Sequence, residues 1–116
     1  MKESHGVLPK SLPPLKSVRH LPFRDLFVHV RFVMAGDDGS LLCTYYAAEG
    51  EERDGDWMFW GLVRDSELRM GCFSLSEMRR AALSRGAVLR EDAGFARRPM
   101  AEVLELEGAR GYDAEG

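Results

Sequence analysis

The 116-residue sequence contains only two cysteines, Cys43 and Cys72. They lie in separate apolar runs, and neither has a second cysteine or a histidine at the spacing of a metal site. We interpret both as buried free thiols. A disulfide between neighbouring strands is the alternative, which a reducing cytoplasm disfavours.

Long hydrophobic runs are also missing, since no stretch approaches the ~20 apolar residues that a membrane-spanning helix needs. The segment Met1–Lys16 carries lysines and prolines but no continuous apolar core, so it does not fit a secretory signal peptide. We therefore expect no membrane association and a cytoplasmic location.

Recognisable catalytic motifs are absent as well. Nucleophilic catalysis needs a serine or cysteine beside an oriented histidine, but His5 and His20 lie in the proline-rich N-terminal region and His29 lies in a strand pattern. Ser74 and Ser76 are explained by helix capping. The glycines lack the strand-to-helix context of a phosphate-binding loop. We expect no enzyme, no cofactor and no metal; convergence of His29, Glu91 or Asp92 in a deep pocket would reopen the enzyme hypothesis.

The length and the apolar fraction of 45% are typical of one globular domain. We predict a flexible arm over 1–11, in which Met1–Val7 is disordered, a single domain over 12–106 and a mobile acidic tail over 107–116. Leu8, Leu12 and Leu15 can dock on the domain.

Alternating apolar residues predict strands in the first half of the chain. The run 26–34 reads as one strand, with Gly36–Gly39 as a tight turn and 41–49 as the second strand of a hairpin. An acidic loop over 49–56 precedes an aromatic central strand over 57–63, and a further strand is expected over 70–73.

The period then changes to that of a helix. Ser74 and Glu77 form a capping-box pattern, in which each side chain bonds the other residue's amide, and Gly86 supplies a left-handed stop. A strand over 87–90 and a short helical turn from Pro99 through Leu104 follow. The fold class is therefore α+β: an antiparallel meander of about four to five strands, one main helix packed on it and a short C-terminal helical turn.

Several segments occur in the order of a known family: Leu12-Pro-Pro-Leu15, Val28-His-Val-Arg-Phe32, Phe59-Trp-Gly-Leu-Val63, Gly71-Cys-Phe-Ser-Leu-Ser-Glu-Met78 and Leu89-Arg-Glu-Asp92. From about Leu12 to Val103 the chain resembles domain-of-unknown-function family 2958, small proteins of bacterial plasmids, integrative elements and phages. It departs from that family at Cys72, where a tyrosine is usual, in a longer acidic loop and in its two ends. The resemblance implies a mobile genetic element as setting and a bacterial host cell, but no reaction.

The net charge of -3 is distributed in blocks of alternating sign, which does not favour a dedicated nucleic-acid-binding protein. An acidic segment with two tryptophans is our candidate partner-binding surface. Its residues are Glu49, Glu51, Glu52, Asp54, Asp56, Trp57 and Trp60. The candidate phosphate contacts are Arg79, Arg80, Arg85 and Arg90. For each set, ordinary solvation or core packing is the alternative.

Two functional hypotheses follow. The first is a non-enzymatic, protein-binding inhibitor of a host defence complex, similar in action to an anti-CRISPR protein, which covers a basic nucleic-acid-binding surface. The second is a nucleic-acid-binding accessory protein for plasmid or phage maintenance. In either case we expect a monomer or a weak homodimer.

Overall fold

The computed structural model describes residues 12–108, and the predicted arm over 1–11 and residues 109–116 of the tail lie outside this range. A five-stranded antiparallel sheet has the strand order β5-β4-β3-β2-β6, and β1 and β7 form a separate two-stranded pair. The strands are β1 (Phe27–Val28), β2 (Val30–Ala35), β3 (Leu41–Arg53), β4 (Asp56–Arg64), β5 (Leu68–Ser74), β6 (Val88–Glu91) and β7 (Arg98–Pro99). The helices are η2 (Phe23–Asp25), α1 (Leu75–Ser84) and α2 (Met100–Gly108). The predicted α+β class is confirmed.

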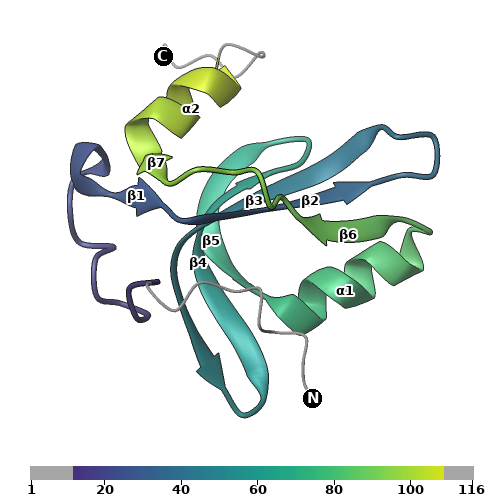
Figure 1. Cartoon of the computed structure of the whole chain (residues 1–116), viewed down its shortest axis with the longest axis horizontal. Coiled ribbons are helices and arrows are strands. Elements are labelled where there is room, and N and C mark those ends of the chain that lie inside the picture. Colours follow the sequence, from purple (N-terminus) through teal and green to yellow (C-terminus); the bar gives the residue numbers. More distant parts are fainter. Residues whose placement is uncertain (1–11, 109–116) are drawn as a thin grey trace.

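The sheet is a meander with one strand added at its far edge. Strands β2 to β5 are joined in sequence by tight connections, and each pairs antiparallel with the next. Helix α1 then crosses one face and returns the chain to β6, which pairs with the free side of β2. Figure 1 shows α1 and α2 on opposite sides of the sheet.

Each face of the sheet has its own apolar cluster. The cluster under α1, here the α1-side core, includes Phe32, Tyr45, Phe59, Phe73 and Met78. The cluster under α2, the α2-side core, consists of the buried residues Leu26, Val28, Tyr46, Ala48, Leu62, Met100 and Val103. Strand residues alternate between the two clusters, as expected for a sheet covered on both faces.

The predicted continuous strand over 26–34 is wrong at His29, where β1 ends before β2 begins. Val28 packs in the α2-side core, whereas Val30 packs in the α1-side core, although a regular strand would place both on one face. The His29 amide still bonds the Ala47 carbonyl at 2.9 Å. The break therefore turns β1 away to pair with β7 while β2 enters the main sheet.

Strand β3 is longer than predicted because the acidic segment is not a loop. It pairs with β4 as far as Arg53 and Asp56, so only Asp54 and Gly55 form the turn. A bulge lies between Ala47 and Glu49, opposite Gly61 and Trp60. A Cβ atom at Gly61 would lie 1.8 Å from the Tyr46 carbonyl oxygen, so this position requires glycine.

The predicted start and end of the main helix are confirmed. Of the two bonds of the capping box, the structure shows that from the Glu77 amide to Ser74 Oγ, at 3.1 Å. Leu75, Met78 and Ala82 form the buried side of α1. Gly86 follows the helix with a φ of +64°.

Two other expectations, on the C-terminal segment and on Cys72, need correction. Helix α2 starts after Pro99 and continues through Gly108, so Glu107, assigned to the mobile tail, is instead buried at its end. Cys72 is exposed, because it lies on the edge strand β5; Cys43 is buried, and both thiols are free.

No helix within 12–108 is long and apolar enough to cross a bilayer.

Candidate functional site

Glu49 was predicted to contact a partner, but it is fully buried in the β3 bulge. Its carboxylate accepts hydrogen bonds from the backbone amides of Lys16, Val18 and Arg19 at 2.7 to 2.9 Å. The Arg19 guanidinium donates two more, at 3.0 and 2.7 Å. Glu49 therefore fixes the segment before η2 to the sheet, and that prediction is corrected.

The ionised form of Glu49 is the stable one in this environment. Burial alone would raise its pKa, but the Arg19 side chain and the three backbone amides outweigh burial and lower the pKa below its ordinary value. No local sequence pattern predicts this contact, because Glu49 and the segment Lys16–Arg19 are about thirty residues apart.

Two further acidic residues are also engaged within the protein. Glu51 accepts from the Leu15 amide at 3.0 Å and pairs with Arg53 at 2.7 Å. Asp56 accepts from the Ser76 amide at 3.1 Å and from the Ser76 hydroxyl at 2.7 Å, so it ties the start of β4 to the first turn of α1. Each carboxylate thereby holds a neighbouring segment in place.

Glu52 and Asp54 remain exposed at the tip of the β3–β4 hairpin. Asp54 has a φ of +54° and precedes Gly55, which also has a positive φ, so the tip is a tight turn. Within residues 12–108, neither carboxylate has a hydrogen bond or an ion pair. Among the residues of the predicted acidic surface, they carry the charges without a partner in the described range.

The two tryptophans are half-buried on opposite faces of β4. Trp57 stacks on Phe59, with ring centroids 5.8 Å apart, beside the α1-side core. Trp60 packs against the α2-side core, and the Arg19 guanidinium lies 5.0 Å from its ring centroid. Both rings are partly used for packing, which leaves only part of each for a partner.

The arginines of α1 are arranged differently. Arg79, Arg80 and Arg85 are exposed, and none forms an ion pair or a side-chain hydrogen bond within the described part of the chain. Leu83, which is 82% exposed, lies one helical turn after Arg79 and Arg80. We call Arg79, Arg80 and Leu83 of α1, together with Arg85 at its C-cap, the arginine face of α1.

Arg90 does not belong to the arginine face. It pairs in register with Val33, which alternates with Phe32 and Met34 of the α1-side core. Its side chain therefore lies on the α2 side of the sheet. The four candidate phosphate contacts are thus split between two faces.

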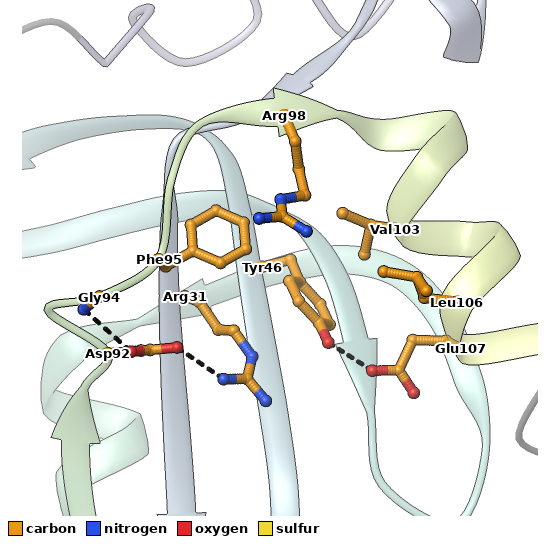
Figure 2. Close-up of a pocket in the computed structure, with 9 residues that line it drawn as sticks. All are labelled: Arg31, Tyr46, Asp92, Gly94, Phe95, Arg98, Val103, Leu106 and Glu107. Carbon is orange, nitrogen blue, oxygen red and sulfur yellow. Dashed lines mark hydrogen bonds and ion pairs between the residues drawn. The ribbon is translucent and has the colours of Figure 1, made fainter.

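Sequence reasoning missed a groove between α2 and the sheet (Figure 2). It has a volume of about 230 Å³, and a second hollow of about 210 Å³ shares Arg31 and Glu107 with it. Arg31 pairs with Asp92 at 2.7 Å, while the Tyr46 hydroxyl donates to Glu107. Figure 2 shows these pairs side by side on the groove floor. In each pair the two partners are 61 residues apart in sequence, so no local sequence pattern indicates the contact.

The groove contains paired charges rather than a free acid or base. Burial and the bond to Glu107 raise the pKa of Tyr46 to about 12, so the phenol is protonated at neutral pH. Arg64 Nε lies 3.7 Å from Glu107 Oε1, the carboxylate oxygen that does not accept from Tyr46. An anion that enters the groove would compete with Asp92 for the Arg31 guanidinium.

The residues that would reopen the enzyme hypothesis do not converge. Asp92 lines the groove, whereas Glu91 lies opposite Phe32 of the α1-side core. His29 lies at the break between β1 and β2, where burial and the nearby Arg97 charge lower its pKa. In the described range, no three histidine, cysteine, aspartate or glutamate side chains are grouped as metal ligands.

Comparison with known proteins adds no relative: no protein-family model, no curated protein and no solved structure matches the chain. The resemblance to domain-of-unknown-function family 2958 therefore stays a prediction.

Proposed function

We propose that this chain is a non-catalytic protein-binding module of a mobile genetic element, which inhibits a host defence complex by covering one of its basic, nucleic-acid-binding surfaces. The observation that carries the proposal is the construction of the β3–β4 hairpin. Its inner carboxylates hold the surrounding segments, and its two tip carboxylates, Glu52 and Asp54, are free within the described residues.

A stiff arm is suited to this task. Figure 1 shows the β3–β4 end extending beyond α1 at one extremity of the molecule. The Leu15 amide donates to Glu51 and the Ser76 hydroxyl donates to Asp56, and these two bonds brace the arm. A braced arm loses little conformational entropy on binding, and its carboxylates would attract a basic groove and speed encounter.

The mobile-element setting comes from the family resemblance, and the choice of a defence complex comes from the chemistry of the tip. A complex that holds nucleic acid presents arginines and lysines to phosphates. Carboxylates on a narrow hairpin can pair with the same side chains, which would exclude the nucleic acid by direct competition.

The test is affinity capture from a bacterial host that carries defence complexes, together with an assay of phage or plasmid survival. The variant Glu52→Gln/Asp54→Asn removes both tip charges. A matched control, Asp37→Asn/Glu67→Gln, removes one exposed carboxylate from the β2–β3 turn and one from the β4–β5 turn. We expect the tip variant to lose capture and protection while the control retains both. Recovery of no partner with no protection, or equal loss in both variants, would contradict the proposal.

A second candidate function has its own supporting observation, the arginine face of α1. Three guanidinium groups without a carboxylate partner within the described residues are available to phosphates. An accessory DNA-binding protein would show binding that weakens steeply with salt. A flat mobility-shift titration at low salt, on single- and double-stranded DNA, would exclude it.

A further inference from the structure

The main sheet has two edges, β5 and β6, and they differ in how well they are protected. β5 pairs with β4 over seven consecutive residues without a bulge. Within residues 12–108, no backbone hydrogen bond joins β5 to any segment other than β4. Among the described residues, its outer row of amide and carbonyl groups is therefore open to a further strand.

Strand β5 lacks the usual features that prevent edge pairing. It contains no proline, and Arg69 is its one charged residue. The opposite edge strand, β6, has only four residues, of which Arg90 and Glu91 are charged. Short length and charge protect β6, whereas β5 is a long and regular edge.

No contact within the described residues requires a glycine at position 71, in the middle of β5. A Cβ atom there would meet nothing within 4 Å, whereas one at Gly61, its partner on β4, would collide with the Tyr46 carbonyl. Glycine within a strand weakens it and often marks the close approach of another backbone. Gly71 lies on an edge strand, where a second backbone can approach from the unpaired side.

We propose that β5 pairs antiparallel with β5 of a second copy of this chain, around a two-fold axis at Gly71. In this register all seven residues overlap: Met70 lies opposite Cys72, Leu68 opposite Ser74, and Arg69 opposite Phe73 of the second copy. Centring the axis on Arg69 would place like charges face to face, and any centre other than Gly71 would shorten the overlap.

This pairing is isologous, so the same seven residues close both edges and no open edge is left to propagate a fibre from β5. The contact is small, because it consists of one strand from each copy. The dimer is therefore of the weak class, and it forms and dissociates with protein concentration.

Charge placed at position 71 tests the proposal, because a side chain there is accommodated by the folded monomer. Wild-type protein is expected to show concentration-dependent dimerisation in sedimentation equilibrium. Gly71→Lys and Gly71→Glu should each raise the dissociation constant about fivefold, since identical charges meet at the axis. An equimolar mixture of the two variants should dimerise again, because opposite charges then meet. Thermal melts of each variant show that the monomer remains folded.

A cysteine at the axis gives an independent measurement. In the background Cys72→Ser, which removes the exposed native thiol, Gly71→Cys should form an intermolecular disulfide under mild oxidation. Directly opposed strand residues have Cα atoms about 4.5 to 5.5 Å apart, within the range that a disulfide spans. Ser84→Cys in the same background, exposed on α1, is the control and should stay monomeric. A wild-type monomer at every concentration, or equal cross-linking at 71 and 84, would overturn the proposal.

Discussion

The acidic end of the β3–β4 hairpin and the arginine face of α1 carry opposite charges, and the molecule uses them differently. Glu49, Glu51 and Asp56 each accept hydrogen bonds from other segments. Arg79 and Arg80 have no ion pair within residues 12–108. A cluster of charge in sequence therefore does not indicate a free charged surface, because buried or partly buried carboxylates are retained where amides and guanidinium groups bind them.

The largest expected effect is at Glu49. Glu49→Gln should lower the free energy of unfolding by about 3 kcal/mol, because it leaves Arg19 and three amides without their anionic acceptor. Since the folded pKa lies below the ordinary value, the stabilisation is complete above the unfolded pKa of about 4.3 and is lost as pH falls through the lower folded value. Urea unfolding at neutral and acidic pH measures both effects.

Glu52→Gln is the matched control for this prediction, since it removes a carboxylate three residues away that is exposed. Its unfolding free energy should stay within about 0.5 kcal/mol of wild type. Similar losses at 49 and 52 would show that Glu49 has no special role and would remove the contrast between the hairpin's inner and outer charges.

Asp56 should have the next largest effect. Asp56→Ala removes the acceptor of the Ser76 amide and hydroxyl at the first turn of α1, which should cost about 1 to 2 kcal/mol. Asp54→Asn, two residues away at the tip, is the control and should be nearly neutral. Thermal unfolding of the two variants measures the difference; an unchanged melting temperature in Asp56→Ala would mean that the brace between β4 and α1 is unimportant.

Glu91 should respond in the opposite direction. Burial raises its pKa, and its Oε1 atom is buried without a hydrogen-bond partner within the described residues. The contribution of Glu91 to the free energy of unfolding is fully present below the pKa of the unfolded chain, where the carboxyl is protonated. It is lost as pH rises through the higher pKa of the folded protein. Glu91→Gln should therefore stabilise the protein by up to about 1 kcal/mol at neutral pH and flatten its pH dependence. A decrease in melting temperature at neutral pH would show that the Glu91 carboxylate has a stabilising partner and would contradict this prediction.

Local patterns predicted much of the fold. Alternation identified the strand around Phe32, and an aromatic run of strand length identified the strand around Phe59. Turn residues identified Gly36–Gly39, and the Ser74 cap identified the start of α1. Each of these signals acts over a few residues, where backbone preference and side-chain period decide the structure.

Long-range contacts were not predictable in the same way. The face change at His29 depends on pairing with Ala47, and the burial of Glu49 depends on amides of the N-terminal segment. The exposure of Cys72 follows from the position of β5 at the sheet edge. Strand order and segment docking set these three features, and neither is encoded in a local period.

The smallest expected effect on stability is on the arginine face. Arg79→Ala/Arg80→Ala should change the unfolding free energy by no more than about 0.5 kcal/mol, because both side chains are exposed and without an acidic partner in the described range. Alanine is also the best helix former. Denaturant unfolding measures this, and DNA mobility shift with the same variant measures whether the face binds phosphate. A stability loss comparable to that of Asp56→Ala would mean that these arginines have internal partners, and the difference between the two charged regions would disappear.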